Sequence, residues 1–190
     1  MNKRSTATFT LTRCGVLAAI SIILFYIEIP IFGPYKLDFS TLPAILAGFA
    51  MGPVQGVIIV LIKNLIHMLS SRTGLVGELA DFIMSCAYVI FASLLYRRFR
   101  SRKGALISML IGTAAMTVAA LFVNKFILFP LYGFTDAAVV GMCSSLWSYI
   151  DNINKFIVVI TMPFNLLKGL SLSVVTYLLY KRISPLLHSK

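Results

Sequence analysis

Charged residues are scarce in this sequence, and acidic residues are the scarcest of them. Only 12% of the 190 residues are charged, six of them Asp or Glu, whereas a soluble domain carries about 25% charged residues. Hydrophobic residues make up 59% of the chain. A chain this apolar cannot cover a globular surface with polar groups, so we expect lipid to be its solvent.

Cysteine is also rare, and several motifs of enzymes are missing. Cys14, Cys86 and Cys143 lie in apolar surroundings without metal-ligand spacing, which predicts small buried side chains rather than a metal site. The chain contains no GxxxxGK[ST], GxGxxG, HExxH or GxSxG motif. We therefore expect no enzyme activity and no ATP hydrolysis by this chain itself.

The cations outnumber the acids, and the net charge is +11. Such an excess can indicate a nucleic-acid partner, because Lys and Arg neutralise phosphates. Here most of the cations flank apolar segments and have few aromatic neighbours that could stack on bases, which indicates membrane topology and no nucleic-acid partner. The first apolar stretch lacks a cleavage site of small residues, so we expect it to be a retained span.

Four apolar segments are long enough to cross about 30 Å of hydrocarbon as helices. They cover residues 9–29, 79–96, 105–129 and 157–180. A single crossing between the first two would place the basic loop 96–103 outside the cell, against the positive-inside tendency. We therefore expect two crossings there, with the turn at Gly52 and Pro53.

The two crossings are expected at residues 41–51 and 54–69. The first would be only about 16 Å long and must be shielded by neighbouring protein, a setting in which transporters often build substrate sites. The sequence thus predicts an all-α integral membrane protein with six transmembrane helices, a short second helix and both termini cytoplasmic. We expect a single domain over residues 1–190.

Polar residues recur at the predicted outer ends of the helices, where they are costly unless they face a cavity or a partner. Asn165 and Lys168 share one helical face and suit a polar ligand, with a helix contact or a buried ion pair as the alternative. Lys63 and His67 share another face, for which pairing with Glu78 or Asp81 is favoured over metal binding. The aromatic loop 130–155 is a candidate lid or an interfacial anchor.

The chain resembles the substrate-binding S-components of energy-coupling factor (ECF) vitamin transporters, most closely those that bind riboflavin. The resemblance rests on KLDFSTLPAILAGFAMGPVQGVIIVLIKNLIHMLSSRTGLVGELADF, on the YRRF turn and on FNLLKG in the last helix. With the six-helix layout it covers nearly the whole chain. It implies riboflavin capture and uptake across a bacterial cell membrane, powered by a transmembrane coupling subunit and two ATPase subunits.

The resemblance also implies which residues meet the vitamin. The matching positions are Leu37, Asp38, Phe39, Ser40, Glu78, Leu79, Asn124, Asn165 and Lys168. Riboflavin has a flat isoalloxazine ring with a uracil-like edge and a ribityl chain of hydroxyls. We expect Phe39 nearest the ring, with Asn165 and Lys168 at its edge. No metal and no cofactor beside the transported vitamin is implied.

Small residues on the first helix, Gly15, Ala18 and Ala19, allow another helix to approach closely. From the residues alone this face could serve internal packing or docking, and the resemblance implies docking on the coupling subunit. Two alternatives for the whole chain stay open: an S-component for another vitamin (biotin, folate or thiamine), and a membrane scaffold without a ligand. Lys168 would repel cationic thiamine and attract the carboxylates of biotin and folate.

Overall fold

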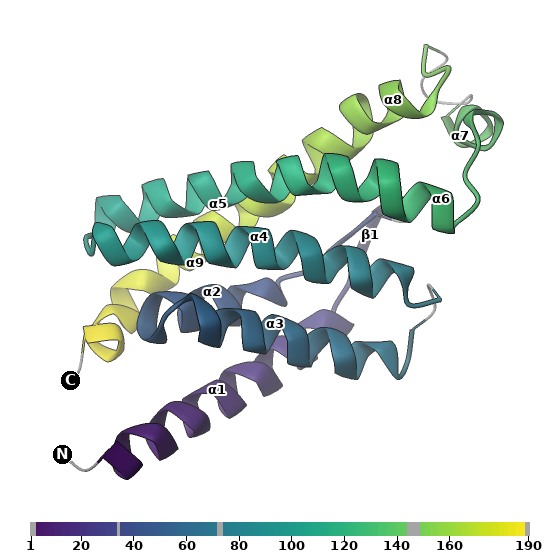
Figure 1. Cartoon of the computed structure of the whole chain (residues 1–190). Coiled ribbons are helices and arrows are strands. Elements are labelled where there is room, and N and C mark those ends of the chain that lie inside the picture. The colour runs from purple at the N-terminus through teal and green to yellow at the C-terminus, as the bar shows by residue number, and fades with distance from the viewer. Residues whose placement is uncertain (1–2, 34, 72–73, 144–148, 189–190) are drawn as a thin grey trace.

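A bundle of helices and one hairpin make up the part of the chain that the computed structural model describes, residues 3–33, 35–71, 74–143 and 149–188 (Figure 1). The first half comprises α1 (Lys3–Tyr26), β1 (Ile29–Phe32), β2 (Tyr35–Leu37), α2 (Thr41–Met51), α3 (Pro53–Met68) and α4 (Val76–Arg98). The second comprises α5 (Arg102–Val123), the π-helix η1 (Asn124–Leu128), α6 (Phe129–Leu131), α7 (Asp136–Cys143), α8 (Ile153–Phe156), the π-helix η2 (Ile157–Thr161) and α9 (Met162–His188).

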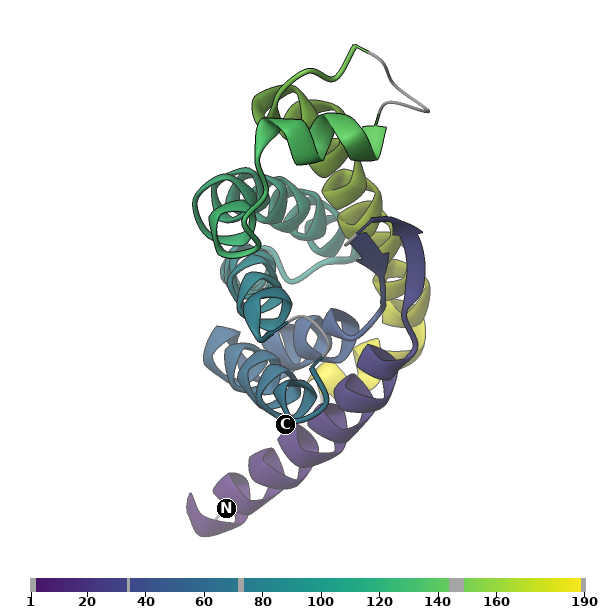
Figure 2. The same ribbon diagram turned by 90° about the vertical axis from the view of Figure 1, so that its right-hand side faces the viewer.

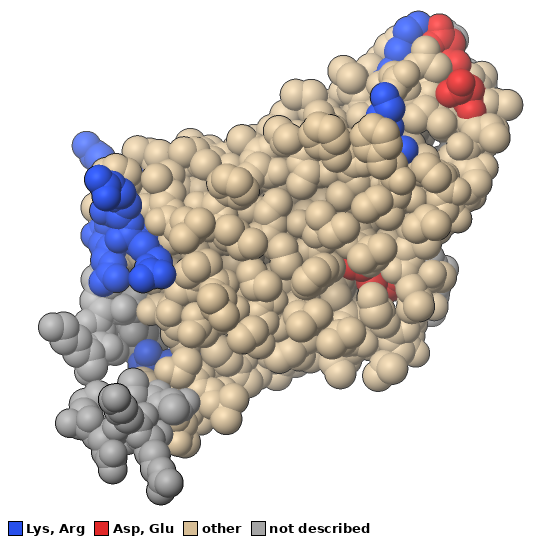
Figure 3. Space-filling model, viewed as in Figure 1, with Lys and Arg blue, Asp and Glu red and all other residues tan. Residues whose placement is uncertain are grey.

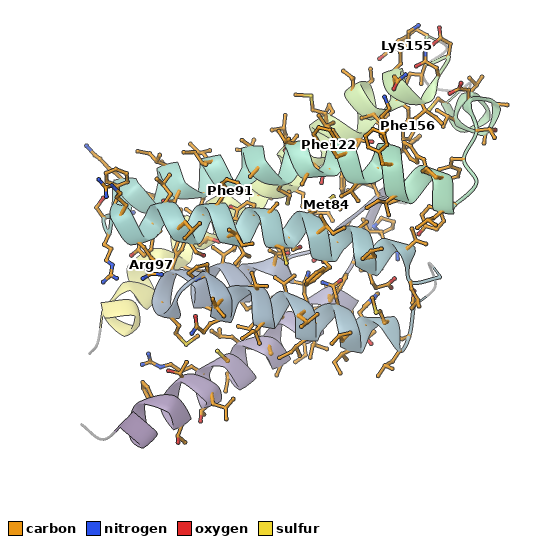
Figure 4. All side chains as sticks on the ribbon, viewed as in Figure 1. Met84, Phe91, Arg97, Phe122, Lys155 and Phe156 are labelled. Carbon is orange, nitrogen blue, oxygen red and sulfur yellow. The ribbon has the colours of Figure 1, made fainter. Side chains whose placement is uncertain are left out.

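Four helical stretches of the described chain are long and apolar enough to cross a membrane, as the sequence predicts. They cover Thr8–Tyr26, Val76–Arg98, Arg102–Leu131 and Ile153–Leu179. Figure 4 shows Phe91 and Phe122 pointing outward from α4 and α5, and 53% and 61% of their surfaces are exposed. Apolar faces of this extent suit contact with lipid.

The predicted break between the second and third helices is confirmed. α2 ends at Met51, Gly52 adopts a φ of 120° that other residues rarely reach, and Pro53 opens α3. Nearly all of α2 is buried among α1, α3, α4 and α9, so this eleven-residue helix is shielded by protein along its length. Its close contact with α3 depends on Gly56, where a Cβ would lie 2.8 Å from the carbonyl oxygen of Ala44.

The connection between α1 and α2 is a hairpin, which corrects the expectation of a loop in an all-α chain. β1 pairs antiparallel with β2, with Ile29 opposite Leu37 and Pro30 opposite Lys36. β-branched residues favour the strand conformation, and Gly33 supplies a positive φ in the turn. The first helix consequently ends at Tyr26 rather than at residue 29, and the fold is mostly rather than entirely helical.

Charged residues gather at the two ends of the bundle. Figure 3 shows Lys and Arg where α4 meets α5, which we call the basic end, and both acidic and basic residues beside α7 and α8 at the opposite end. α1 begins and α9 ends near the basic end (Figure 1). Figure 2 shows the hairpin lying beside α9, so two segments far apart in the sequence meet at the end away from the termini.

Candidate ligand-binding site

A cavity of about 340 Å³ lies between the hairpin, the C-terminal ends of α1 and α3, the start of α4, η1 and α9. Small-molecule sites usually measure about 300–1,000 Å³, so this volume suits a small ligand. The aromatic rings of its wall are those of Phe25, Tyr26, Tyr35, Tyr132 and Phe164. Its charged or titratable residues are Glu28, Lys36, Asp38, His67, Glu78, Asp81 and Lys168. Met84, labelled in Figure 4, contributes an apolar surface from α4.

Tyr35 connects the hairpin to the second half of the chain. Its ring lies 5.0 Å from that of Phe164, and its hydroxyl donates to Asn124 Oδ1 at 3.0 Å and contacts Thr161 Oγ1. Burial raises the pKa of this hydroxyl above its ordinary value, although the hydrogen bond with Thr161 lowers it, so the group stays neutral. The hairpin is thus held to η1 and η2 through one buried side chain.

One π-helix places a polar residue on the cavity wall, and the other places one behind it, in contact with the lining residues Tyr35 and Asn165. Asn124 begins η1 and Thr161 ends η2, where the wider turn changes the direction of the side chains that follow. Asn165, one turn after Thr161, donates its amide Nδ2 to the Thr161 carbonyl at 2.9 Å. Among the described residues its Oδ1 has no hydrogen-bond partner, so an acceptor remains on the cavity wall for a ligand N–H.

Four buried charges lie at the cavity, three of them in its wall; we call Asp38, Lys63, Asp81 and Lys168 the four-charge cluster. Lys168 Nζ lies 2.8 Å from Asp38 Oδ2 and 3.3 Å from Asp81 Oδ1. Lys63 Nζ lies 2.7 Å from Asp81 Oδ2. Two ammonium groups and two carboxylates balance one another, which buried charges require. The predicted pairing of Lys63 with Asp81 is confirmed, and Lys168 forms the buried ion pair that was the alternative to a purely ligand-binding role.

Electrostatics keep the Asp38 carboxylate ionised. Burial opposes the charged form, but Lys168 and Lys63 outweigh it and lower the pKa of Asp38 below its ordinary value. The Ser40 backbone N–H donates to Asp38 Oδ1 at 2.9 Å, and the Ser40 hydroxyl contacts the same oxygen. Asp38 is therefore a fixed anion between the hairpin and α2.

A second polar cluster lines the cavity near the end of α1. His67 Nδ1 lies 2.9 Å from Glu78 Oε1, and its ring stacks on Phe25 with centroids 4.0 Å apart. Glu28 forms an ion pair with Lys36 and lies 3.9 Å from His67 Nε2. The cluster joins α3, α4 and the hairpin, and in the part of the chain that the structure describes no three His, Cys, Asp or Glu side chains are arranged to hold a metal ion.

The expected site residues divide into two groups. Those that line the cavity are Asp38, Glu78, Asn124, Asn165 and Lys168. Those outside its lining are Leu37, Phe39, Ser40 and Leu79. Phe39 packs against the core around α2, and Ser40 touches the four-charge cluster.

Sequence reasoning missed the aromatic wall. Tyr35 and Phe164 adjoin expected site residues, but only the hairpin and η2 turn them toward the cavity. β-branched residues and a glycine turn are the signal for the hairpin, but strands of four and three residues carry too short a pattern to predict the direction of Tyr35. The aromatic loop contains α6, α7 and α8, and its Trp147 lies outside the described residues.

The small residues of α1 do not all face the same way. Gly15 and Ala19 are exposed, and a Cβ added to Gly15 would meet nothing within 4 Å. Ala18 is 4% exposed and packs into the core around α2. The open face of the helix therefore runs through Gly15 and Ala19, whereas Ala18 serves internal packing.

Comparison with known proteins identifies the family. Residues 9–180 match the family described as ECF transporter, substrate-specific component. A Staphylococcus aureus (strain TCH60) protein named riboflavin transporter RibU is 37% identical over 176 residues, covering 91% of this chain and 89% of that protein. The riboflavin transporter FmnP of Bacillus subtilis (strain 168) is 30% identical over 177 residues, 90% of each chain. A solved structure described as "Structure and mechanism of the S component of a bacterial ECF transporter" is 34% identical, with a TM-score of 0.76, and the match covers 96% of this chain and 99% of that one. The chain belongs to the family of ECF transporter substrate-specific components.

Proposed function

We propose that this chain binds riboflavin in the cavity between the hairpin and α9 and carries it across the membrane as the substrate-specific component of an ECF transporter. The observation that carries the proposal is the cavity wall, which combines aromatic rings with the unpaired Asn165 oxygen and the Lys168 ammonium. The curated relatives named as riboflavin transporters support the same ligand.

Membership of this family makes the chain a multi-pass membrane protein and a transport component, not an enzyme. We infer that energy comes from a separate ECF transmembrane coupling subunit and two ATPase subunits, since the sequence contains no P-loop motif. We further infer six transmembrane helices, both termini in the cytoplasm and one domain over the whole chain. The four long spans, the shielded α2 and the basic residues where α4 meets α5 support that topology.

The chemistry of riboflavin fits the lining residues. Asn165 Oδ1 is suited to accept the N–H of the uracil-like edge, and Lys168 to donate to a ring carbonyl. Tyr35 and Phe164 offer aromatic surface for the isoalloxazine ring. Asp38, Glu78 and Asn124 complete the inferred contacts, and Ser40 acts through Asp38. Contacts with Leu37, Phe39 or Leu79 require a shift of the hairpin or α4 on binding.

The exposed small-residue face of α1 is the inferred docking surface for the coupling subunit. Gly15 and Ala19 leave room for a neighbouring helix backbone, which small residues permit in membranes. Ala18 supports this surface from the inner side of α1. The open position at Gly15 is the structural feature that favours docking there.

Other vitamins are the competing ligands. The charge of Lys168 is already balanced by Asp38 and Asp81, so a carboxylate vitamin such as biotin or folate meets no unpaired cation at this side chain. This weakens the attraction that Lys168 alone would exert on a carboxylate. A neutral vitamin fits the four-charge cluster better.

The absorption spectrum of the protein, purified from cells that contain riboflavin, tests the proposal. We expect the visible bands of a flavin to accompany the protein and to be lost after unfolding. A preparation that instead carries biotin, folate or thiamine, identified by mass spectrometry of the released ligand, would assign the chain to another vitamin. Protein that carries no vitamin and binds none when each is added would favour the scaffold alternative.

A further inference from the structure

Lys63 is completely buried and does not line the cavity, yet its ion-pair partner Asp81 does. Its side chain is 0% exposed, and it contacts Asp81, which forms part of the cavity wall beside Asp38 and Lys168. We infer that Lys63 is a positioning residue for vitamin binding: by neutralising Asp81 it leaves Lys168 free to present one N–H to the ligand. This inference rests on the proposed function.

Lys63 reaches both carboxylates of the four-charge cluster. Its Nζ donates to Asp81 Oδ2 at 2.7 Å and to Ser40 Oγ at 2.6 Å. The Ser40 hydroxyl in turn donates to Asp38 Oδ1. Each carboxylate therefore has one oxygen held on the Lys63 side and offers its other oxygen to Lys168.

Lys168 has one donor left over. An ammonium group has three N–H donors, and among the described residues Lys168 has two acceptors, Asp38 Oδ2 at 2.8 Å and Asp81 Oδ1 at 3.3 Å. The residue also lines the cavity. A third N–H is consequently available to a polar atom of the ligand.

Charge balance makes that third donor depend on Lys63. Among the described residues, Lys63 and Lys168 are the cations that form ion pairs with Asp38 and Asp81. Without Lys63 the cluster holds two buried carboxylates and one ammonium group. An uncompensated buried charge is strongly unfavourable, so Lys168 would be drawn deeper between the carboxylates and away from the ligand.

The test compares Lys63→Met with the double variant Lys63→Met/Asp81→Asn, in which the cluster is neutral again. Riboflavin affinity is measured by quenching of flavin fluorescence with the purified protein. We expect Lys63→Met to weaken affinity by at least about tenfold, the effect of one lost charge-assisted hydrogen bond, and the double variant to recover most of it. Lys125→Met, which removes an exposed cation outside the cluster, is the matched control and should bind like the wild type.

A pH series separates this role from a merely structural one. Protonation of Asp38 or Asp81 would restore the charge balance of the cluster in Lys63→Met. The riboflavin affinity of this variant, divided by that of the wild type, should therefore rise as the pH falls. The other charged or ionisable groups at the cavity or near the cluster, Glu28, Lys36, His67, Glu78 and Cys86, are present in both proteins, so the variant is compared with the wild type at each pH. A structural role limited to the packing of the Lys63 side chain predicts a constant ratio.

Several results would overturn the inference. Wild-type affinity in Lys63→Met would do so, as would a loss that neither the second substitution nor acid recovers. If Lys63→Met is too unstable to purify, the double variant decides, because a folded neutral variant that fails to bind contradicts the role of charge balance. If the wild-type protein binds no riboflavin, the proposed function is refuted. If the wild type binds but the variants behave otherwise than expected, only the inference about Lys63 is refuted.

Discussion

Lys168 Nζ lies 2.8 Å from Asp38 Oδ2 and joins α9 to the segment between β2 and α2 across 130 positions of the chain. Both side chains are buried and both line the cavity. The ion pair therefore stabilises the hairpin side of the site while leaving the ammonium group within reach of a ligand. Because the pair serves both the fold and the site, substitutions at these two positions should change both stability and riboflavin affinity.

Removing Lys168 should destabilise the fold as well as weaken binding. Lys168→Met leaves Asp38 without its direct cation, and breaking a buried pair costs about 3–5 kcal/mol of unfolding free energy. The double variant Lys168→Met/Asp38→Asn should recover most of that stability and still bind riboflavin poorly. Thermal unfolding in detergent measures the first effect and fluorescence quenching the second. Equal stability of the wild type and Lys168→Met would contradict the structural role.

Asn165→Ala should weaken riboflavin binding by about tenfold or more with little effect on folding, because the ligand loses one buried hydrogen bond. The amide makes only one hydrogen bond within the described protein, to the Thr161 carbonyl, so its structural contribution is small. Asn154→Ala, at an exposed position on α8, is the matched control. Unchanged affinity in Asn165→Ala would remove this residue from the site.

Tyr35→Phe should reduce affinity modestly while keeping the aromatic ring in place. The substitution removes the donor to Asn124 Oδ1 and the contact with Thr161, and an unpaired buried acceptor costs about 1–3 kcal/mol. Tyr149→Phe, which alters an exposed tyrosine, serves as the control. Both affinity and unfolding temperature are measured. An unaltered unfolding temperature would show that Tyr35 does not hold the hairpin to η1 and η2.

Gly15→Trp and Ala19→Trp should leave riboflavin binding intact and abolish uptake when the coupling and ATPase subunits are present. A bulky ring on this open face would prevent close approach of another helix, while nothing within the chain contacts an added Cβ at Gly15. Phe122→Trp, on an exposed face of α5, should affect neither property. Normal uptake by both α1 variants would refute docking at this surface.

The break between α2 and α3 could be predicted because its causes are local. Gly52 relaxes the backbone and Pro53 restricts it, irrespective of tertiary contacts. α2 ends just before this pair, and α3 begins at Pro53. The cost of an isolated buried charge also predicted that Lys63 pairs with Glu78 or Asp81, and the structure shows that the partner is Asp81. Both predictions depend on properties of the residues themselves and not on the detailed packing of the fold.

The hairpin and the direction of the side chains around it could not be predicted in the same way. A four-residue strand and its three-residue partner carry too short an alternating pattern, and their contacts with η2 and α9 join residues far apart in the sequence. As a result Phe39 was expected nearest the ligand, whereas Tyr35 and Phe164 line the cavity. The π-helices also shift side chains by an amount that regular helical spacing does not include.

Equilibrium titration of riboflavin with the purified, ligand-free wild-type protein tests the central claim most directly. Binding in one cavity with aromatic walls predicts saturable quenching of flavin fluorescence with one riboflavin per chain, and Asn165→Ala should shift the curve to higher protein concentration. Flavin fluorescence that stays constant as folded protein is added would contradict the account.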